Sequence, residues 1–155
     1  MTRWLAQGLL VVATWLLSTT GVHAQLAPSC TISVTSVAFG SYNVFTTTPA
    51  DSTGTITYRC NSQATNISIS LSDGSGSSFN PRTLRKGSEV LDYNLYTNAA
   101  RTTIWGDGTG GTSVFTQGNP PNNQNVNLTV YGRIPAQQDV SAGNYSDTVL
   151  AIINF

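Results

Sequence analysis

The residue types that usually do chemistry in enzymes are scarce in this 155-residue sequence. It has one histidine (His23), one glutamate (Glu89) and one lysine (Lys86), and its aspartates fall mostly in turn-rich stretches, where local hydrogen bonding explains them. General acid–base catalysis and activated nucleophiles depend on these residue types. The sequence therefore predicts a protein that is not an enzyme, with no catalytic residue and no cofactor.

One glycine-rich stretch, GDGTGG (residues 106–111), has the composition of a phosphate-binding loop. Such a loop needs a helix after it, whereas TSVFTQ follows here and is typical of a strand, so we expect a hairpin turn. Asp107 lacks the ladder of oxygen ligands that a calcium site requires, and no metal site is predicted. Two interpretations remain for its surroundings: Trp105 and Asp107 form a ligand-contact loop for a sugar, or Trp105 packs in the core.

The first 24 residues have the features of a secretory signal peptide: a positive charge at Arg3, an apolar run over residues 9–17, and small residues before a cleavage site at Ala24. We therefore divide the chain into a signal peptide, residues 1–24, and one domain, residues 25–155. After cleavage, six Lys and Arg side chains face seven Asp and Glu side chains, so no basic field exists to bind nucleic acid. No later apolar run approaches the roughly 20 residues of a membrane span, so an exported protein without one is expected.

Two cysteines, Cys30 and Cys60, remain after cleavage. An even count in an exported chain predicts a disulfide, and two cysteines allow a single pairing. The alternatives are a metal pair or free thiols, but no histidine or third cysteine remains to complete a metal site.

Apolar residues in the domain come in short alternating runs and not at helical spacing, which predicts strands. The runs are TISVTSVAF, GTITYRC, NISISLS, LDYNLYT, NVNLTVYGRI and SDTVLAIINF, and stretches rich in Gly, Asn, Asp and Pro separate them. The basic stretch PRTLRKG, with Arg82, Arg85 and Lys86, is expected to be a solvated loop without a role. About six main strands in this length predict an all-β, immunoglobulin-like sandwich.

The last run has apolar residues on both faces. Val149, Ala151, Ile153 and Phe155 fall on one face, and Leu150 and Ile152 fall on the other. No turn or partner strand follows in the sequence, so we expect another polypeptide to cover this strand.

Four motifs occur in order: F-G-x-Y (39–42), L-x-Y-x-L-Y-T (91–97), W-G-D-G (105–108) and Y-G-R-I-P-x-x-Q (131–138). With them the chain from Cys30 to Phe155 resembles the spore coat U domain family, which includes subunits of archaic chaperone-usher pili of the Csu type. The resemblance implies a sandwich that lacks its final strand. It also implies three partners: a periplasmic chaperone that lends a strand, an outer-membrane usher, and other subunits that donate an N-terminal strand.

The resemblance further implies that Val149, Ala151, Ile153 and Phe155 form the acceptor groove and the strand on which the chaperone docks. A protein of this kind passes through the periplasm to the cell surface, as part of a pilus or an extracellular coat. The alternative from another functional class is a secreted monomeric module that binds a carbohydrate or a surface.

The predicted N-terminal lead departs from the pattern of a strand donor. Only QLAPS lies between Ala24 and Cys30, and these five residues span at most about 17 Å. We therefore expect a subunit that accepts a strand without donating one, at a tip or terminating position, serving adhesion or biofilm formation. Cleavage after Ala13 would leave a longer lead and would restore the donor role.

Overall fold

The computed structural model describes residues 26–155, and this part of the chain is built from strands, with one short 3-10 turn, η1 (Gly74–Gly76). The predicted signal peptide lies outside the described residues. The strands are β1 (Cys30–Thr35), β2 (Ala50–Cys60), β3 (Asn66–Leu71), β4 (Arg82–Lys86), β5 (Glu89–Tyr96), β6 (Phe115–Gly118), β7 (Val126–Ile134) and β8 (Ala151–Asn154). The expectation that PRTLRKG forms a loop is wrong, because β4 occupies it and pairs with β5.

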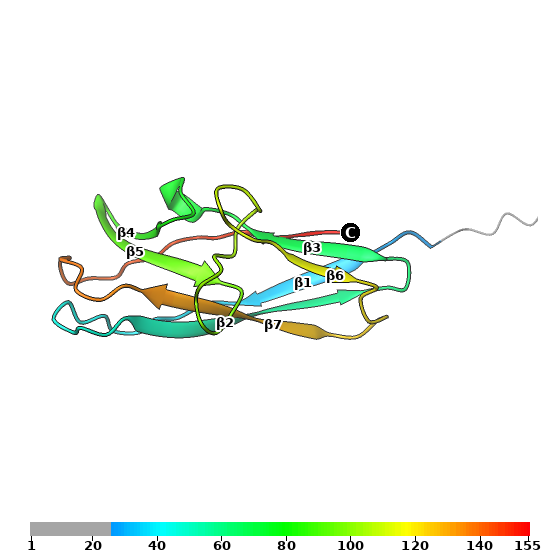
Figure 1. Ribbon diagram of the computed structural model, residues 1–155, viewed down its shortest axis with the longest axis horizontal. Helices are drawn as coiled ribbons and strands as arrows, with labels where there is room; N and C mark the ends of the chain where they lie inside the picture. Colours follow the sequence, from blue (N-terminus) through cyan, green and yellow to red (C-terminus); the bar gives the residue numbers. More distant parts are fainter. Residues whose placement is uncertain (1–25) are drawn as a thin grey trace, which may run out of the picture.

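The strands form two antiparallel sheets that face each other as an immunoglobulin-like sandwich (Figure 1). One sheet has five strands in the order β1-β2-β7-β5-β4, and the other has three in the order β6-β3-β8. The all-β prediction and the sandwich class are thus confirmed. The loops over residues 36–49 and 135–145 lie at one end of the long axis, and the C-terminus lies toward the other end (Figure 1).

The core lies between the sheets and follows from the alternation seen in the sequence. Ile56 and Tyr58 on β2, and Ile67 and Ile69 on β3, are all buried, as a period of two residues along each strand requires. Full burial of one such aliphatic side chain stabilises the fold by about 1.5 to 3 kcal/mol.

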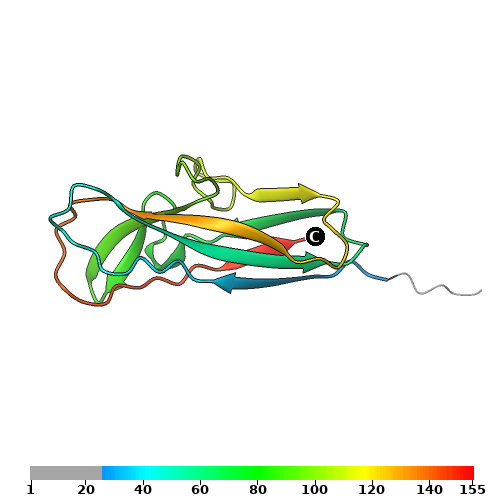
Figure 2. The ribbon, with the colours of Figure 1, turned by 90° about the horizontal axis from the view of Figure 1, so that it is seen from below.

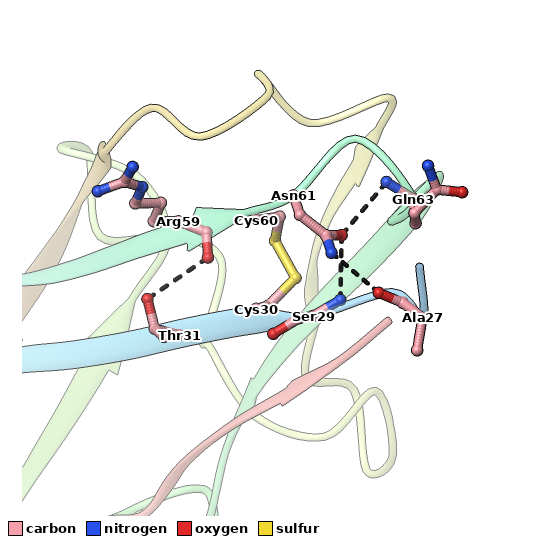
Figure 3. The surroundings of a disulfide bond; sticks show 8 residues. All are labelled: Ala27, Ser29, Cys30, Thr31, Arg59, Cys60, Asn61 and Gln63. Carbon is pink, nitrogen blue, oxygen red and sulfur yellow. Dashed lines mark hydrogen bonds between the residues drawn. A yellow bond between two sulfur atoms is a disulfide. The ribbon is translucent and has the colours of Figure 1, made fainter. Parts of the chain in front are cut away.

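The predicted disulfide is present and lies between the first two strands (Figure 3). Cys30 and Cys60 face each other in register on β1 and β2, and they are 30 residues apart in the sequence. Closing a loop of this size stabilises the domain by about 3 to 4 kcal/mol on the loop-entropy model.

The chain leading into β1 is fixed beside this disulfide by one side chain, that of Asn61 (Figure 3). Its Nδ2 donates to the carbonyl of Ala27 at 2.9 Å, and its Oδ1 accepts from the amide of Ser29 at 3.1 Å. Its own backbone amide donates to the carbonyl of Ser29 at 2.9 Å. Residues 27–29 therefore continue the line of β1 beside the start of the β2–β3 turn.

Two strand edges are free on the same side of the sandwich (Figure 2). Within residues 26–155, β1 pairs only with β2 and β8 pairs only with β3. No described strand bridges β1 and β8, so the sandwich lacks the strand that would lie there, as predicted.

Candidate functional site

A groove opens between the two free edges, and two chain segments form its rims. The first rim, residues 34–44, runs from the end of β1 into the loop, and the second rim, residues 140–151, runs up to β8. The groove has two parts that share Val37, Phe39, Leu84 and Asp147 in their linings. We call the part of about 150 Å³ near β8 the slot, and the part of about 840 Å³ near the loops the chamber.

The floor of the groove is the hydrophobic core itself. Ile56 and Val130 of the five-stranded sheet and Leu71 of the three-stranded sheet line the slot. Val34 points inward from β1 but is 58% exposed, because nothing in the described chain lies over it. An uncovered core of this kind lacks a layer of apolar side chains.

The first rim is held against the sandwich by close packing and by one tyrosine hydroxyl. A Cβ on Gly132 would lie 2.6 Å from Val37 and 2.8 Å from the Phe39 ring, so only glycine lets these side chains approach. The Tyr42 hydroxyl donates to the carbonyl of Pro135 at 2.8 Å and accepts from the amide of Gln138 at 2.9 Å.

The second rim is bonded first to one sheet and then to the other. The backbones of Ser146 and Arg85 exchange two hydrogen bonds, of 2.8 and 3.1 Å, which tie the rim to β4. Four residues later, Leu150 accepts from the amide of Ser72 at 2.9 Å and donates to the Ser72 hydroxyl at 3.0 Å, beside β3. The rim therefore crosses from sheet to sheet between residues 146 and 150.

Asp147 fixes this crossing and places a carboxylate on the inner side of the rim. Its Oδ1 accepts from the amide of Ser75 at 2.8 Å, and its Oδ2 accepts from the Tyr93 hydroxyl at 2.6 Å. Partial burial opposes ionisation of Asp147, but the bonds from Ser75 and Tyr93 outweigh it, so its pKa is lowered. Burial, and then the bond to Asp147, raise the pKa of Tyr93, so this hydroxyl remains a donor.

A polar cluster at the β4–β5 hairpin holds the outer part of the second rim. The Glu89 carboxylate accepts from the hydroxyls of Tyr145 and Ser141, and the Lys86 ammonium donates to the carbonyl of Ala142 at 2.9 Å. The bonds from Tyr145 and then from Ser141 lower the pKa of Glu89 to about 2. The carboxylate is exposed, so this cluster orients the rim and adds little to the free energy of unfolding.

The predicted groove residues lie along the second rim and β8, but in different surroundings. Val149 and Ala151 line the slot. Ile153 is half-buried against the core, and Phe155 is 51% exposed beyond the end of β8, in a shallow hollow beside β6. Only Val149 and Ala151 of the four line the main groove.

The free edge of β8 carries backbone groups without partners. Because the N–H and C=O of Leu150 both point toward β3, those of Val149 and Ala151 point away from it, toward the groove. The amide of Leu71, which faces Ala151 in register, donates instead to the carbonyl of Gly106 at 3.1 Å. A row of unpaired N–H and C=O groups beside an apolar slot is chemically suited to pairing with a further strand.

Arg82, which was expected to lie in a solvated loop without a role, is fully buried behind the second rim. Its guanidinium donates to the carbonyl of Ser72 at 3.0 and 2.8 Å, to the carbonyl of Trp105 at 2.7 Å, and to Oδ1 of Asn94 at 2.8 Å. Burial lowers the pKa of Arg82. Since Ser72 also binds Leu150, Arg82 supports the point at which the rim reaches β3.

The loop of Trp105 and Asp107 is a turn against the core. Trp105 is 1% exposed and its indole N–H donates to the carbonyl of Ile69 at 2.9 Å, so its ring offers no face to a ligand. Asp107 is exposed and accepts from the amide and hydroxyl of Thr109 at 2.9 and 2.7 Å. The arrangement favours the core interpretation of Trp105 over the sugar platform.

Neither a metal cluster nor a membrane-spanning helix is found in residues 26–155. No three His, Cys, Asp or Glu side chains of this part of the chain come close enough to hold a metal ion. The same residues contain no helix with the length and apolarity needed to cross a bilayer.

The four sequence motifs lie around the groove. They contain residues that support it, such as Phe39, Gln138 and Trp105, which the strand patterns alone did not identify. Phe39 lies edge-on to Tyr93, with ring centroids 6.0 Å apart. Gln138 donates to the carbonyl of Asp92 at 2.9 Å and accepts from its amide at 2.7 Å, as a neighbouring strand would. Trp105 donates from its amide to the carbonyl of Leu95 at 2.9 Å. The motifs thus position the first rim, the floor of the groove, and the part of the core around Trp105 that lies behind the second rim.

Known proteins resemble parts of this chain. Protein U of Myxococcus xanthus is 38% identical over 68 residues, which cover 43% of this chain and 35% of that protein. A chain in the crystal structure of the CsuC-CsuE chaperone-tip adhesion subunit pre-assembly complex, from archaic chaperone-usher Csu pili of Acinetobacter baumannii, is 26% identical with a TM-score of 0.60. That match covers 84% of this chain and 40% of the other, so this chain spans well under half the length of both relatives.

A model of one family matches almost the whole sequence, including all four motifs and both rims of the groove. The match to the Spore Coat Protein U domain covers residues 16–151, and the chain belongs to this family.

Proposed function

We propose that this protein is a structural subunit of a surface fibre or coat, assembled by strands that neighbouring chains insert into its groove. The observation that carries the proposal is the free edge of β8 beside the uncovered slot. An extended segment placed there would gain backbone hydrogen bonds along the edge and would fill the slot and the chamber with alternate side chains.

The geometry sets the size of that segment. The rims extend over residues 34–44 and 140–151, so a strand that runs between them has about ten to twelve residues and spans roughly 33 to 40 Å. If about four of its apolar side chains are buried, they contribute on the order of 6 to 12 kcal/mol. Such a contribution is similar to the whole free energy of unfolding of a small domain.

We infer three kinds of partner from the family and from the chaperone–subunit complex of its structural relative. A periplasmic chaperone lends the first strand, an outer-membrane usher exchanges it, and another subunit donates the permanent one. A position at the tip, and a role in adhesion or biofilm formation, are the finer proposals. N-terminal sequencing of the exported protein tests the tip position, since a start at Gln25 supports it and a start at Thr14 supports a rod subunit.

Capture of a chaperone by groove variants tests the proposed function. The tagged full chain is expressed with its own signal in its native host, and a two-domain immunoglobulin-like chaperone should co-purify one to one. Val149→Asp places a charge in the slot and should abolish this capture, whereas Thr148→Asp, one residue away on the exposed side of the rim, should not. Recovery of the wild type alone as a folded monomer would instead support the secreted binding module.

A further inference from the structure

The apolar side chains on the inner face of the second rim and β8 line the groove or pack on the core. The groove does not account for the apolar side chains on their outer face. Leu150 and Ile152 point away from the core and are 60% and 48% exposed. Large exposed aliphatic side chains are few in the described part of the chain, and Leu150 and Ile152 are two of them that lie side by side.

The surroundings of these two side chains are polar wherever the chain supplies a neighbour. On the β3 side, the residue in register with Ile152 is Ser70, and Leu150 is bonded to Ser72. Serines are too small to cover the aliphatic chains of Leu150 and Ile152. On the other side, along the free edge, no described strand is hydrogen-bonded to β8.

The outward side chains on the other edge strand differ in kind. Thr31, Ser33 and Thr35 of β1 alternate with its inward residues, and all three are exposed. Around the two free edges, the outer surface is therefore polar on β1 and on β3, and aliphatic on β8. Leu150 and Ile152 therefore lie directly beside the position that an added strand would occupy.

Resting on the proposed function, we propose that the strand completing this domain is apolar on both of its faces next to β8. Its inward side chains fill the groove, and two outward side chains, two residues apart, pack against Leu150 and Ile152. Side chains directly opposite each other on neighbouring strands have Cβ atoms about 4.5 to 5.5 Å apart, so this contact follows from strand pairing alone. The partner is thus an extended segment that departs from simple alternation, and Leu150 and Ile152 select it over a segment with a polar outer face.

Two synthetic peptides and three forms of the full-length exported protein test this inference. Both peptides have twelve residues with valine at alternate positions to fill the groove. In one peptide all outward positions are threonine, and in the other the two central outward positions are valine, which has nearly the same shape. The proteins are the wild type, the double variant Leu150→Thr with Ile152→Thr, and the control Val90→Thr, which makes the same kind of change at an exposed position on β5. Binding is measured by fluorescence anisotropy.

An apolar cross-strand pair changes a binding constant by about 1.4- to 5-fold, so two pairs should give roughly 2- to 25-fold. We expect outward valines to strengthen binding by this factor for the wild type and for Val90→Thr, and to have almost no effect for the double variant. Circular dichroism and thermal midpoints check that all three proteins fold.

The inference is overturned if outward valines have the same effect on all three proteins, or no effect on the wild type, while both peptides bind. Those outcomes leave the proposed function intact, because binding through the groove persists. If neither peptide binds the wild type, strand addition itself is refuted, and the inference fails with it.

Discussion

Replacing Ala151 by leucine should separate the stability of the isolated domain from its capacity to accept a strand. Ala151 is the smallest side chain of the second rim that lines the slot, which has a volume of about 150 Å³. Three additional carbon atoms placed there would enter the slot, whose lining also includes Ile56, Leu71 and Val130. The substitution therefore fills space that an inserted side chain would otherwise occupy.

The two effects have opposite signs and similar sizes. At about 0.8 kcal/mol per buried methylene, the leucine should raise the free energy of unfolding of the strand-free domain by up to about 2 kcal/mol. An added strand would lose one buried side chain, worth about 1.5 to 3 kcal/mol. Its affinity should then fall by about 10- to 150-fold.

Denaturant unfolding of the strand-free protein and titration with the valine-alternating peptide measure these two quantities. Ala100→Leu is the matched control, because the same change at an exposed loop position should alter neither. A more stable Ala151→Leu variant that binds the peptide as tightly as the wild type would show that the strand does not enter the slot. A less stable variant would show that the slot is too tight for three carbon atoms.

Three further substitutions probe the supports of the second rim and of the chain leading into β1. Arg82→Met leaves the carbonyls of Ser72 and Trp105 without their donor, and should lower the free energy of unfolding by about 3 to 5 kcal/mol in urea; an effect under 1 kcal/mol would contradict the bonding described. The pKa of Glu89 lies near 2, below its ordinary 4.5, so its bonds are complete above pH 4.5 and are lost as the pH falls toward 2. Because the cluster is exposed, Glu89→Gln should lower the thermal midpoint only slightly at pH 7 and not at all near pH 2. A large drop, or an equal drop at both pH values, would refute this role. Asn61→Ala should speed hydrogen exchange at the Ser29 amide, which loses its acceptor, without changing exchange in β3.

Strand patterns predicted the parts of the fold that depend on local periodicity. The alternation in NISISLS placed Ile67, Ile69 and Leu71 on one face of β3, and all three are buried. The pairing of Cys30 with Cys60 required only that two cysteines remain in an exported domain. The two-sided apolar character of the last strand predicted that another polypeptide covers it, whereas the free edge itself followed from the resemblance to the family.

These patterns did not predict the buried Arg82 behind the second rim. Arg82 follows a proline in a polar stretch, which is typical of an exposed loop. Its burial depends on acceptors from Ser72, Asn94 and Trp105, which lie 10 to 23 residues away. Similarly, β1 ends at Thr35 although the predicted run TISVTSVAF extends to Phe39, because Val37 and Phe39 pack against Gly132 and leave the strand ladder.

Hydrogen exchange at the free edge of β8 tests strand addition most directly. The amides of Val149 and Ala151 are compared between the strand-free domain and the protein purified from its assembled form. We expect rapid exchange in the first sample and strong protection in the second, while the amide of Ile152, which faces β3, changes less. Equal exchange of Val149 and Ala151 in both samples would contradict an inserted strand at this edge.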